Sequence, residues 1–305
     1  MSNTDIQPSY LIIDWGTTNF RAFAMSEAGD LLAKKELGMG LLQVEAGQFA
    51  KALETVLAEW LSDYKSLPIY MAGMVGSLQG WVNVPYAAAP LSNGQLIDQA
   101  HQFDLPWGAS ATIIPGVSYQ VSDSVYDVMR GEEVQLFGLA KLVEQTDFIA
   151  VMPGTHSKHV KFEQAKLTEF STYMTGELFS VISKQTILGK GLPEQSKSAP
   201  ADAFYQGVTE SQLDNFTNVL FHARTHRVFG TIAETEIYDF LSGLLIGYEL
   251  KNLKNQTIYL VGGESLCQRY VLVCEQFGIQ AKIVNGDDCF LAGMSGLIKE
   301  LNNVN

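Results

Sequence analysis

The chain has 305 residues, a formal net charge of −13 and a sequence pI of about 4.8. Hydrophobic residues make up 47% and charged residues 17%, which is ordinary for one large or two medium globular domains. The acidic total comes without a basic stripe, so we expect no nucleic-acid partner. No apolar run reaches membrane-spanning length and the polar start is unlike a signal peptide, so we expect a cytoplasmic protein with no membrane partner.

The most informative stretch is L-I-I-D-W-G-T-T-N-F-R, at residues 11–21. Three apolar residues run into Asp14, turn-forming residues follow, and a second apolar segment predicts a returning strand. Gly16 lets the backbone approach a ligand, and the amides and hydroxyls of Thr17 and Thr18 can donate to phosphate oxygens. Asp14 offers oxygen ligands suited to Mg²⁺, directly or through a water. The alternative is an ordinary hairpin with a polar tip.

The following elements predict the start of a ribonuclease-H-like domain. After the hairpin, residues 31–37 indicate a third strand, residues 46–62 an amphipathic helix and residues 68–72 a buried strand. The loop that comes next is rich in glycine and proline and carries Trp81 and Tyr86. Such a loop either contacts a ligand with its aromatic residues or is a surface loop that they pin in place.

A helix is expected over residues 125–142. It contains Arg130, and Glu132 and Glu133 stand where the helix properly begins. Carboxylates are favoured at a helix N-terminus, so capping charge is the simple interpretation of both glutamates.

A second hairpin resembles the first in design. An apolar strand over residues 148–152 leads into P-G-T-H-S-K, and a return strand over residues 159–162 follows. One such hairpin in each half of the chain indicates duplicated domains that face one cleft. We infer this duplication from pattern alone, because the chain shows no strict sequence repeat.

Two later features have competing interpretations. A strand over residues 257–261 ends in Gly262-Gly263, which either lets a flat ligand lie on the backbone or makes a tight strand-to-helix turn. His222 and His226 are four residues apart on a predicted helix over residues 215–227. Because alanine follows the first histidine where a zincin needs glutamate, we interpret the pair as structural or surface residues.

Three segments together resemble the phosphate-1, phosphate-2 and adenosine motifs of the actin/hexokinase/Hsp70 ATPase superfamily. They are Asp14-x-Gly16-Thr17-Thr18, Gly154-Thr155-x-Ser157-Lys158 and Gly262-Gly263-x-Ser265, each after a strand. The resemblance implies an α/β fold with two ribonuclease-H-like domains around a central nucleotide cleft. The expected domains are residues 1–140 and 141–305, with a helical insertion at about 171–233. Pro153 stands where many members carry an acidic residue, which argues against a second metal-holding carboxylate.

The chain also resembles the 2-dehydro-3-deoxygalactonokinase family over nearly its whole length. Five segments carry this resemblance: D-W-G-T-T-N-F-R-A, M-V-G-S-x-x-G-W-x-x-x-P-Y, M-R-G-E-E-V-Q, M-P-G-T-H-S-K-H and Y-M-T-G-E-L-F. The resemblance implies ATP-dependent phosphorylation of 2-dehydro-3-deoxy-D-galactonate at its 6-hydroxyl, with Mg²⁺ as cofactor, in galactonate catabolism.

These resemblances imply roles for individual residues. Asp14 would hold Mg²⁺. The phosphates would be bound by Gly16, Thr17 and Thr18 in one domain and by Gly154, Thr155, Ser157 and Lys158 in the other, while Gly262 and Gly263 would floor the adenosine site. Glu132 is favoured over Glu133 as catalytic base, with Asp14 as an alternative. Most related sugar kinases use aspartate for this base.

The substrate would contact four further residues, which are Arg21, Trp81, Tyr86 and Arg130. Trp81 and Tyr86 would line the sugar-acid pocket, and Arg130 would meet the acid group because a planar guanidinium suits a carboxylate. Arg21 would meet a phosphate or that carboxylate, or would form only a salt bridge.

Three other functions compete with the sugar-acid kinase. One is a kinase for another keto-deoxy acid or a hexose, one is an ATP-driven switch, and one is a phosphatase without a sugar acceptor. The expected partners are ATP and a small sugar acid. The oligomeric state stays open, with a homodimer as one arrangement.

Overall fold

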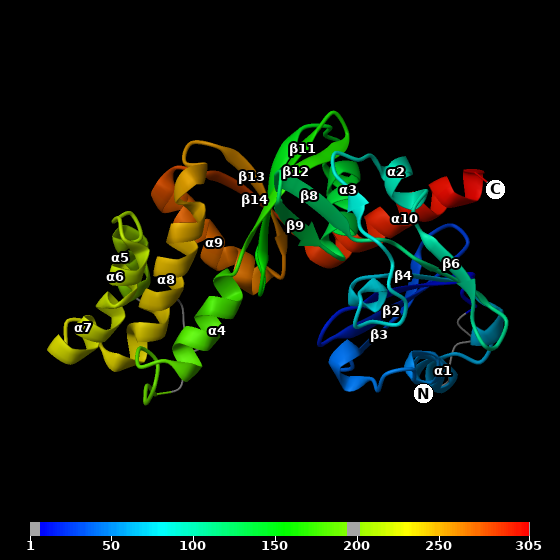
Figure 1. Cartoon of the computed structure of the whole chain (residues 1–305), viewed down its shortest axis with the longest axis horizontal. Coiled ribbons are helices and arrows are strands. Elements are labelled where there is room, and N and C mark those ends of the chain that lie inside the picture. The colour runs from blue at the N-terminus through cyan, green and yellow to red at the C-terminus, as the bar shows by residue number, and fades with distance from the viewer. Residues whose placement is uncertain (1–6, 194–201, 305) are drawn as a thin grey trace. The chain divides into compact units, whose positions relative to one another are not determined.

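The computed structural model describes residues 7–193 and 202–304, and its contacts group the chain into two compact units (Figure 1). Unit 1 comprises residues 1–147, 162–169 and 287–305, and unit 2 comprises residues 148–161 and 170–286. The domain boundary expected at residue 140 and the central cleft stay predictions. Parts of the polar N-terminal stretch and of the expected insertion lie outside the described residues. Within the described ranges, every helix is too short or too polar to cross a lipid bilayer.

Unit 1 is built on a six-stranded sheet in the order β3-β2-β1-β4-β7-β6. β1 is antiparallel to β2 and parallel to β4, and β4 is parallel to β7. The apolar residues of β1 are fully buried in the core of this unit, as the sequence predicts. The strands are β1 (Tyr10–Trp15), β2 (Phe20–Met25), β3 (Leu31–Leu37), β4 (Ile69–Ala72), β6 (His101–Asp104) and β7 (Ser110–Ile113).

The sheet of unit 2 repeats this arrangement in the order β12-β11-β10-β13-β14. β10 is parallel to β13, and β13 is parallel to β14. The first five strands of unit 1 follow the same order as these five, so the expected pair of ribonuclease-H-like α/β folds is confirmed. The strands are β10 (Phe148–Met152), β11 (Ser157–Glu163), β12 (Lys166–Tyr173), β13 (Thr257–Gly262) and β14 (Gln280–Asn285).

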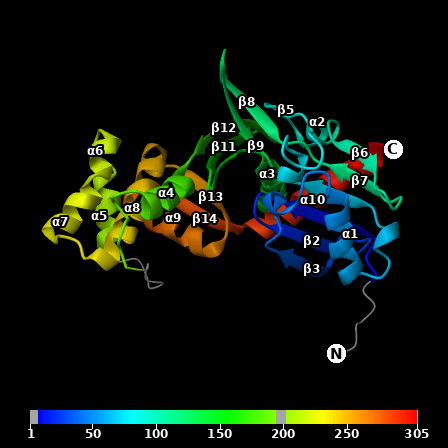
Figure 2. The ribbon, with the colours of Figure 1, turned by 60° about the horizontal axis from the view of Figure 1, so that its bottom comes forward.

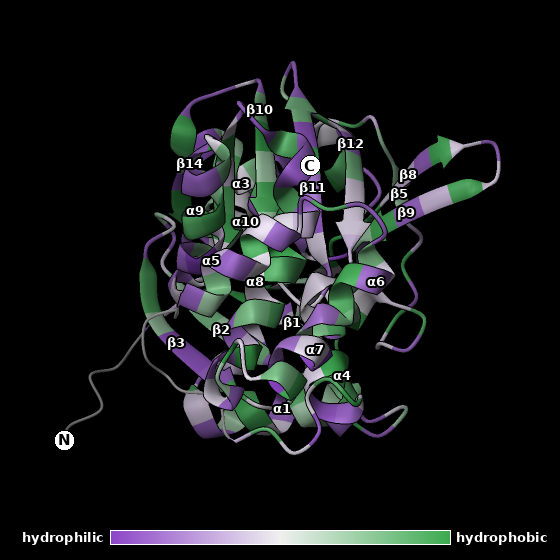
Figure 3. Ribbon diagram, turned by 90° about the vertical axis from the view of Figure 1, so that its left-hand side faces the viewer, coloured by the Kyte–Doolittle hydropathy of each residue, from purple (hydrophilic) through white to green (hydrophobic). Residues whose placement is uncertain are grey.

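A third, small sheet corrects one expectation. It consists of β5 (Ala87–Ala88), β8 (Val117–Ser122) and β9 (Val125–Met129), so the first part of the helix expected over residues 125–142 is a strand. Val125 and Tyr126 favour a strand, and both are more than half exposed, at 52% and 61%. The outer part of this hairpin extends away from the large sheet of its own unit (Figures 2 and 3).

The helices flank the two large sheets. In unit 1 they are α1 (Phe49–Trp60), α2 (Asn93–Ile97), α3 (Glu132–Val143) and α10 (Gly286–Val304). In unit 2 they are α4 (Thr175–Gln185), α5 (Asp202–Glu210), α6 (Phe216–Leu220), α7 (His222–Phe229), α8 (Ile237–Leu250) and α9 (Glu264–Phe277). Short 3₁₀ turns lie at Leu41–Gln43, Tyr64–Ser66, Met74–Gly76, Glu234–Glu236 and Lys251–Leu253. The helix expected over residues 215–227 is two helices, because the chain changes direction at Phe221.

Glycines allow α3 and α10 to approach closely within unit 1. A Cβ atom placed on Gly138 would lie 1.7 Å from the carbonyl oxygen of Cys289. A Cβ atom placed on Gly293 would lie 2.0 Å from the carbonyl oxygen of Val134. The two helix backbones are therefore in direct contact, and this contact fixes the position of α3.

Gly138→Ala should lower the free energy of unfolding by about 3 kcal/mol or more, because the two helix backbones must separate. Gly296→Ala on α10 is the matched control, since its Cβ would meet nothing within 4 Å. The control should be neutral or more stable by about 0.5–1 kcal/mol. Urea unfolding followed by circular dichroism measures both, and equal stability of the two variants would contradict the packing.

Candidate active site

Asp14 is the next-to-last residue of β1 and is paired with Arg21 from the neighbouring strand. The two residues are opposite each other in the β1–β2 register. Arg21 donates from Nε to Asp14 Oδ2 at 3.1 Å, and its Nη2 contacts the same oxygen. Its Nη1 bonds to Asp287, which begins α10, and Lys34 donates to the second oxygen of Asp287 at 2.6 Å. The salt-bridge interpretation of Arg21 is therefore the one that the contacts support.

Burial and neighbouring charges shift the pKa values of Asp14 and Arg21. Burial raises the pKa of Asp14 above its ordinary value, and the adjacent Arg21 guanidinium offsets only part of that rise. Burial alone would lower the pKa of Arg21, but Asp14 and Asp287 raise it above its ordinary value. Arg21 is thus held firmly as a cation beside Asp14.

The backbone at the tip of the β1–β2 hairpin is held by hydrogen bonds from residues 40–42, while its threonine side chains are exposed. The amides of Gly40, Leu41 and Leu42 donate to the carbonyl oxygens of Thr18, Gly16 and Thr17 at 3.0, 3.0 and 3.3 Å. A Cβ atom on Gly40 would lie 2.2 Å from the Thr17 oxygen, so only glycine allows this contact. Thr17 and Thr18 are exposed and line a cavity of about 590 Å³ together with Asp14 and Arg21.

Two glycines bring the start of α3 beside Asp14. Gly73 follows β4 with a φ of +95°, and its Cβ would lie 2.9 Å from the Trp15 carbonyl oxygen and 3.1 Å from Asp14 Oδ1. Gly131 precedes α3 with a φ of +110°, and its Cβ would lie 3.4 Å from the Cα of Gly73. The ends of β1 and β4 and the N-terminus of α3 therefore meet at one place.

Glu132 and Glu133 open α3 in different environments. Glu132 is partly exposed and accepts from the amide of Arg130 at 3.1 Å. Glu133 is fully buried, and both of its carboxyl oxygens accept from the amide of Gly131, at 2.9 and 2.7 Å. Burial, reinforced by the charge of Glu132, raises the pKa of Glu133 to about 8. At neutral pH the buried residue is therefore mostly a neutral acid.

Arg130 is a buried cation with unused donors. Its Nη2 donates to the carbonyl oxygen of Val84 at 2.8 Å, and its guanidinium stacks on Tyr86, 4.4 Å from the ring centre. Among the described residues, Nε and Nη1 are buried without a hydrogen-bond partner. Buried donors left unpaired are costly, so a ligand group that accepts from them would be favoured.

Trp81 lies elsewhere than Tyr86 and Arg130. Its ring stacks on Phe49 at 6.4 Å and contacts the edges of Phe103 and Trp15. It packs against the core of unit 1. Of the two aromatic residues in the loop, only Tyr86 lies on the Arg130 guanidinium.

In unit 2, the tip of the β10–β11 hairpin is open at Gly154, where a Cβ would meet nothing within 4 Å. Thr155 is exposed, and α4 begins directly behind the tip, with a Cβ on Gly176 only 2.4 Å from the Gly154 oxygen. Ser157 and Lys158, which the sequence analysis expects to contact phosphate, are both buried. Lys158 Nζ donates to the hydroxyl of Thr172 at 2.7 Å.

The sequence analysis missed Glu249, which is 2% exposed on α8 and organises this hairpin. Its carboxylate accepts from the hydroxyl of Ser157 at 2.7 Å and from Tyr270 at 2.8 Å, and it also bonds to Thr175. His159 Nε2 lies 2.9 Å from the same carboxylate. A glutamate within the apolar segment at residues 237–250 is the signal that could have pointed to it.

Gly262 and Gly263 lie at the turn between β13 and α9. A Cβ on Gly262 would lie 3.6 Å from the Pro153 carbonyl oxygen, so the ends of β13 and β10 are adjacent, and Gly263 faces open space. Beside them is a mainly apolar cavity of about 200 Å³. Its lining is Gly154, Thr175, Gly176, Phe179, Ser242, Leu245, Ile246, Leu266, Arg269 and Tyr270.

The chain is similar to known proteins over nearly its whole length. The model of the 2-keto-3-deoxy-galactonokinase family matches residues 14–297. The 2-dehydro-3-deoxygalactonokinase of Escherichia coli K12 is 34% identical over 300 residues, which cover 96% of this chain and 99% of that protein. A crystal structure from Sinorhizobium meliloti, described as a candidate 2-dehydro-3-deoxygalactonokinase, is 32% identical with a TM-score of 0.88 and covers 96% of this chain and 99% of its own.

Glu133 should make the stability of the protein depend on pH. Its pKa is about 8 in the folded chain against an ordinary 4.5, so between these values the folded chain keeps a proton that the unfolded chain has lost. The free energy of unfolding should therefore fall as pH rises through this window, by up to about 1.4 kcal/mol per pH unit.

Glu133→Gln should remove that dependence, whereas Glu132→Gln should keep most of it. Urea unfolding of the wild type and both variants at several pH values measures the slope. Parallel curves for the wild type and Glu133→Gln would contradict the assignment.

Proposed function

The chain belongs to the 2-keto-3-deoxy-galactonokinase family, and from this premise we propose that it transfers a phosphoryl group from ATP to the 6-hydroxyl of 2-dehydro-3-deoxy-D-galactonate. One observation carries the proposal: Asp14, Gly73 and the first turn of α3, where Glu132 lies, are close together. Arg130 precedes this turn in the sequence and has guanidinium donors without a hydrogen-bond partner. Phosphoryl transfer requires charge neutralisation, positioning and a base, and these residues offer each of them. We expect the enzyme to act in the cytoplasm, where galactonate catabolism would take place.

Asp14 fits the role of a magnesium ligand. Arg21 contacts only the Oδ2 atom of this carboxylate. The other oxygen, Oδ1, lies 3.1 Å from the position that a Cβ on Gly73 would occupy. Mg²⁺ is commonly held by one or two carboxylates, waters and the substrate phosphates. The ion would neutralise charge on the phosphates, and Asp14 would hold it through a water. The hydroxyls of Thr17 and Thr18 would donate to phosphate oxygens.

In unit 2 we assign the phosphate contacts to the exposed backbone of Gly154 and Thr155. Ser157 and Lys158 support that tip from inside rather than contacting a ligand. The apolar cavity beside Gly262 and Gly263 suits an adenine ring, because nucleotide sites combine apolar walls with a few polar groups.

Glu132 is the residue that we assign as catalytic base. A base must accept a proton, and Glu133 already holds one at neutral pH because its pKa is about 8. Glu133 instead fixes the turn at Gly131 through its two contacts with that amide. Asp14 is the weaker alternative, since Arg21 occupies one of its oxygens.

Arg130 is the residue that we assign to the substrate carboxylate. Its unpaired Nε and Nη1 point to different sides of the guanidinium, so either can donate to a carboxylate oxygen, and the Tyr86 ring keeps the guanidinium plane in place. Trp81 would support this loop from the core. Arg21, held between two aspartates, would act on the charge of Asp14 rather than on the substrate.

The proposed function is tested by ADP release with Mg-ATP, with and without the galactonate acid and with its gluconate epimer alongside. We expect strong dependence on the galactonate acid, and loss of at least 100-fold in kcat in Asp14→Asn, on the order of what loss of a metal-positioning or electrostatic group costs. Asp104→Asn, an exposed residue of unit 1, is the control and should keep full activity. ADP release without any acid would indicate an ATPase or phosphatase, and equal rates on both epimers would leave only a less specific kinase.

Arg130→Met should raise the KM for the sugar acid about 10- to 100-fold while the KM for ATP changes little, because a charge-assisted pair is lost. The sharper measurement uses an analogue whose carboxylate is replaced by a hydroxymethyl group. The wild type should discriminate strongly against this analogue and Arg130→Met should not. If the variant loses both substrates equally, Arg130 serves only packing.

A further inference from the structure

A cluster of potential metal ligands lies in unit 2, in helices that the proposed reaction does not use. Within residues 7–193 and 202–304, one group of three histidine, cysteine or acidic side chains can share an ion, and it consists of Glu210, His222 and His226. Glu210 ends α5, and the two histidines lie on successive turns of α7. One ligand atom from each residue lies within 4.8 Å of the other two.

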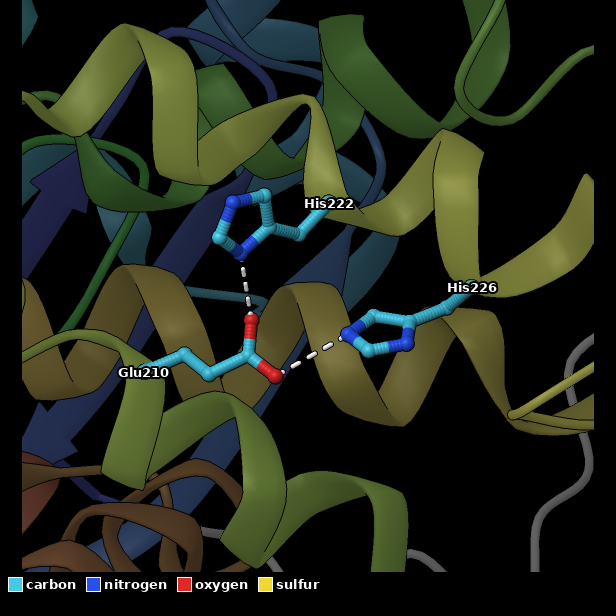
Figure 4. Close-up of side chains that lie close together, drawn as sticks. All are labelled: Glu210, His222 and His226. Carbon is cyan, nitrogen blue, oxygen red and sulfur yellow. Dashed lines mark hydrogen bonds and ion pairs between the residues drawn. The ribbon is translucent and has the colours of Figure 1, made fainter. Parts of the chain in front are cut away.

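The two imidazole rings converge on one carboxylate, each on its own oxygen (Figure 4). His222 Nδ1 lies 2.7 Å from Glu210 Oε2, and His226 Nε2 lies 2.9 Å from Glu210 Oε1. The side chains are only partly exposed, at 32% for His222, 18% for His226 and 16% for Glu210. The inward nitrogen of each ring therefore points at the same partner.

Thr231 holds the outer nitrogen of the His226 ring. Its hydroxyl oxygen lies 2.7 Å from His226 Nδ1 and 3.4 Å from the backbone oxygen of His226. The inward nitrogen, Nε2, lies 2.9 Å from Glu210 Oε1 and 3.3 Å from the side-chain amide nitrogen of Gln206. Both nitrogens of this ring therefore have polar partners that fix its orientation.

Hydrogen bonds join the inward nitrogens of both rings to the carboxylate of Glu210. A metal ion would take the place of the protons in these hydrogen bonds and would bind the same three side chains. Metal-binding histidines in proteins have their outer nitrogen held by a second group that fixes the tautomer, and the Thr231 hydroxyl holds Nδ1 in this way.

We propose that Glu210, His222 and His226 bind a Zn²⁺ ion that joins α7 to α5. Two imidazoles and a carboxylate are a zinc ligand set, with water at the fourth position of the tetrahedron. Zinc bonds of about 2.0–2.2 Å at tetrahedral angles place neighbouring ligand atoms roughly 3.3–3.5 Å apart. The present separations of 2.7 and 2.9 Å would need to open by roughly 0.4–0.8 Å.

The test uses the full chain, freed of metal with a chelator and titrated with Zn²⁺ near neutral pH against a chromogenic zinc chelator. We expect one tightly bound Zn²⁺ that depends on these side chains. His226→Ala, His222→Ala and Glu210→Gln should each weaken it at least about 100-fold, and Thr231→Val about 10- to 100-fold, as loss of an outer-shell partner does. Co²⁺ in place of Zn²⁺ should give the visible absorption of a tetrahedral nitrogen–oxygen site.

Two controls separate this site from others. His101→Ala, an exposed histidine of unit 1, should bind Zn²⁺ as the wild type does. Asp14→Asn should also keep the tight site, which distinguishes it from any ion held at the proposed active site. No tight Zn²⁺ on the wild type would overturn the proposal, as would binding that His226→Ala and His222→Ala leave unchanged in folded protein, and the cluster would then be a hydrogen-bonded clip.

Discussion

The candidate site in unit 1 depends on a close backbone approach at Gly73. A Cβ there would collide with the Trp15 carbonyl oxygen at 2.9 Å, and the positive φ of +95° disfavours any other residue. Because Gly131 packs against the Cα of Gly73, the end of β4 connects Asp14 on β1 with the first turn of α3. The contact of α3 with α10 fixes the other end of that arrangement. The two glycines thus bring together a carboxylate and a helix N-terminus that are far apart in sequence.

The two units use one topology in two ways. In unit 1 the hairpin tip is supported by backbone amides at residues 40–42, and its threonine side chains are exposed. In unit 2 the tip is supported by Glu249, which takes hydroxyl and imidazole groups from β11, α4 and α9. The side chain of Ser157 is used in that support and Lys158 is buried and bonded to Thr172, so neither is an exposed part of the second tip.

The strands and turns could be predicted from the sequence because their signals are local. The apolar run before Asp14 and the Gly-Thr turn after it predict the hairpin, and the structure confirms it. The prediction of a helix at residues 125–129 was wrong, because a mostly exposed strand lacks the alternation of apolar and polar residues that marks a half-buried one. The pairing of Glu249 with Ser157, and of Glu210 with two histidines, joins residues far apart in the chain, so no spacing reveals it. The contacts of Ser157 with Glu249 on α8 and of Lys158 with Thr172 on β12 likewise involve elements that the motif does not contain.

The most direct test of the central claim is a crystal structure with the sugar acid and a non-hydrolysable ATP analogue. The account predicts that the carboxylate pairs with the Arg130 guanidinium through Nε or Nη1, and that the 6-hydroxyl lies within hydrogen-bond reach of Glu132, about 2.6–3.2 Å. Asp14 should face the magnesium ion and the phosphates. A sugar acid bound away from Arg130, or a 6-hydroxyl that reaches neither Glu132 nor Asp14, would contradict the account.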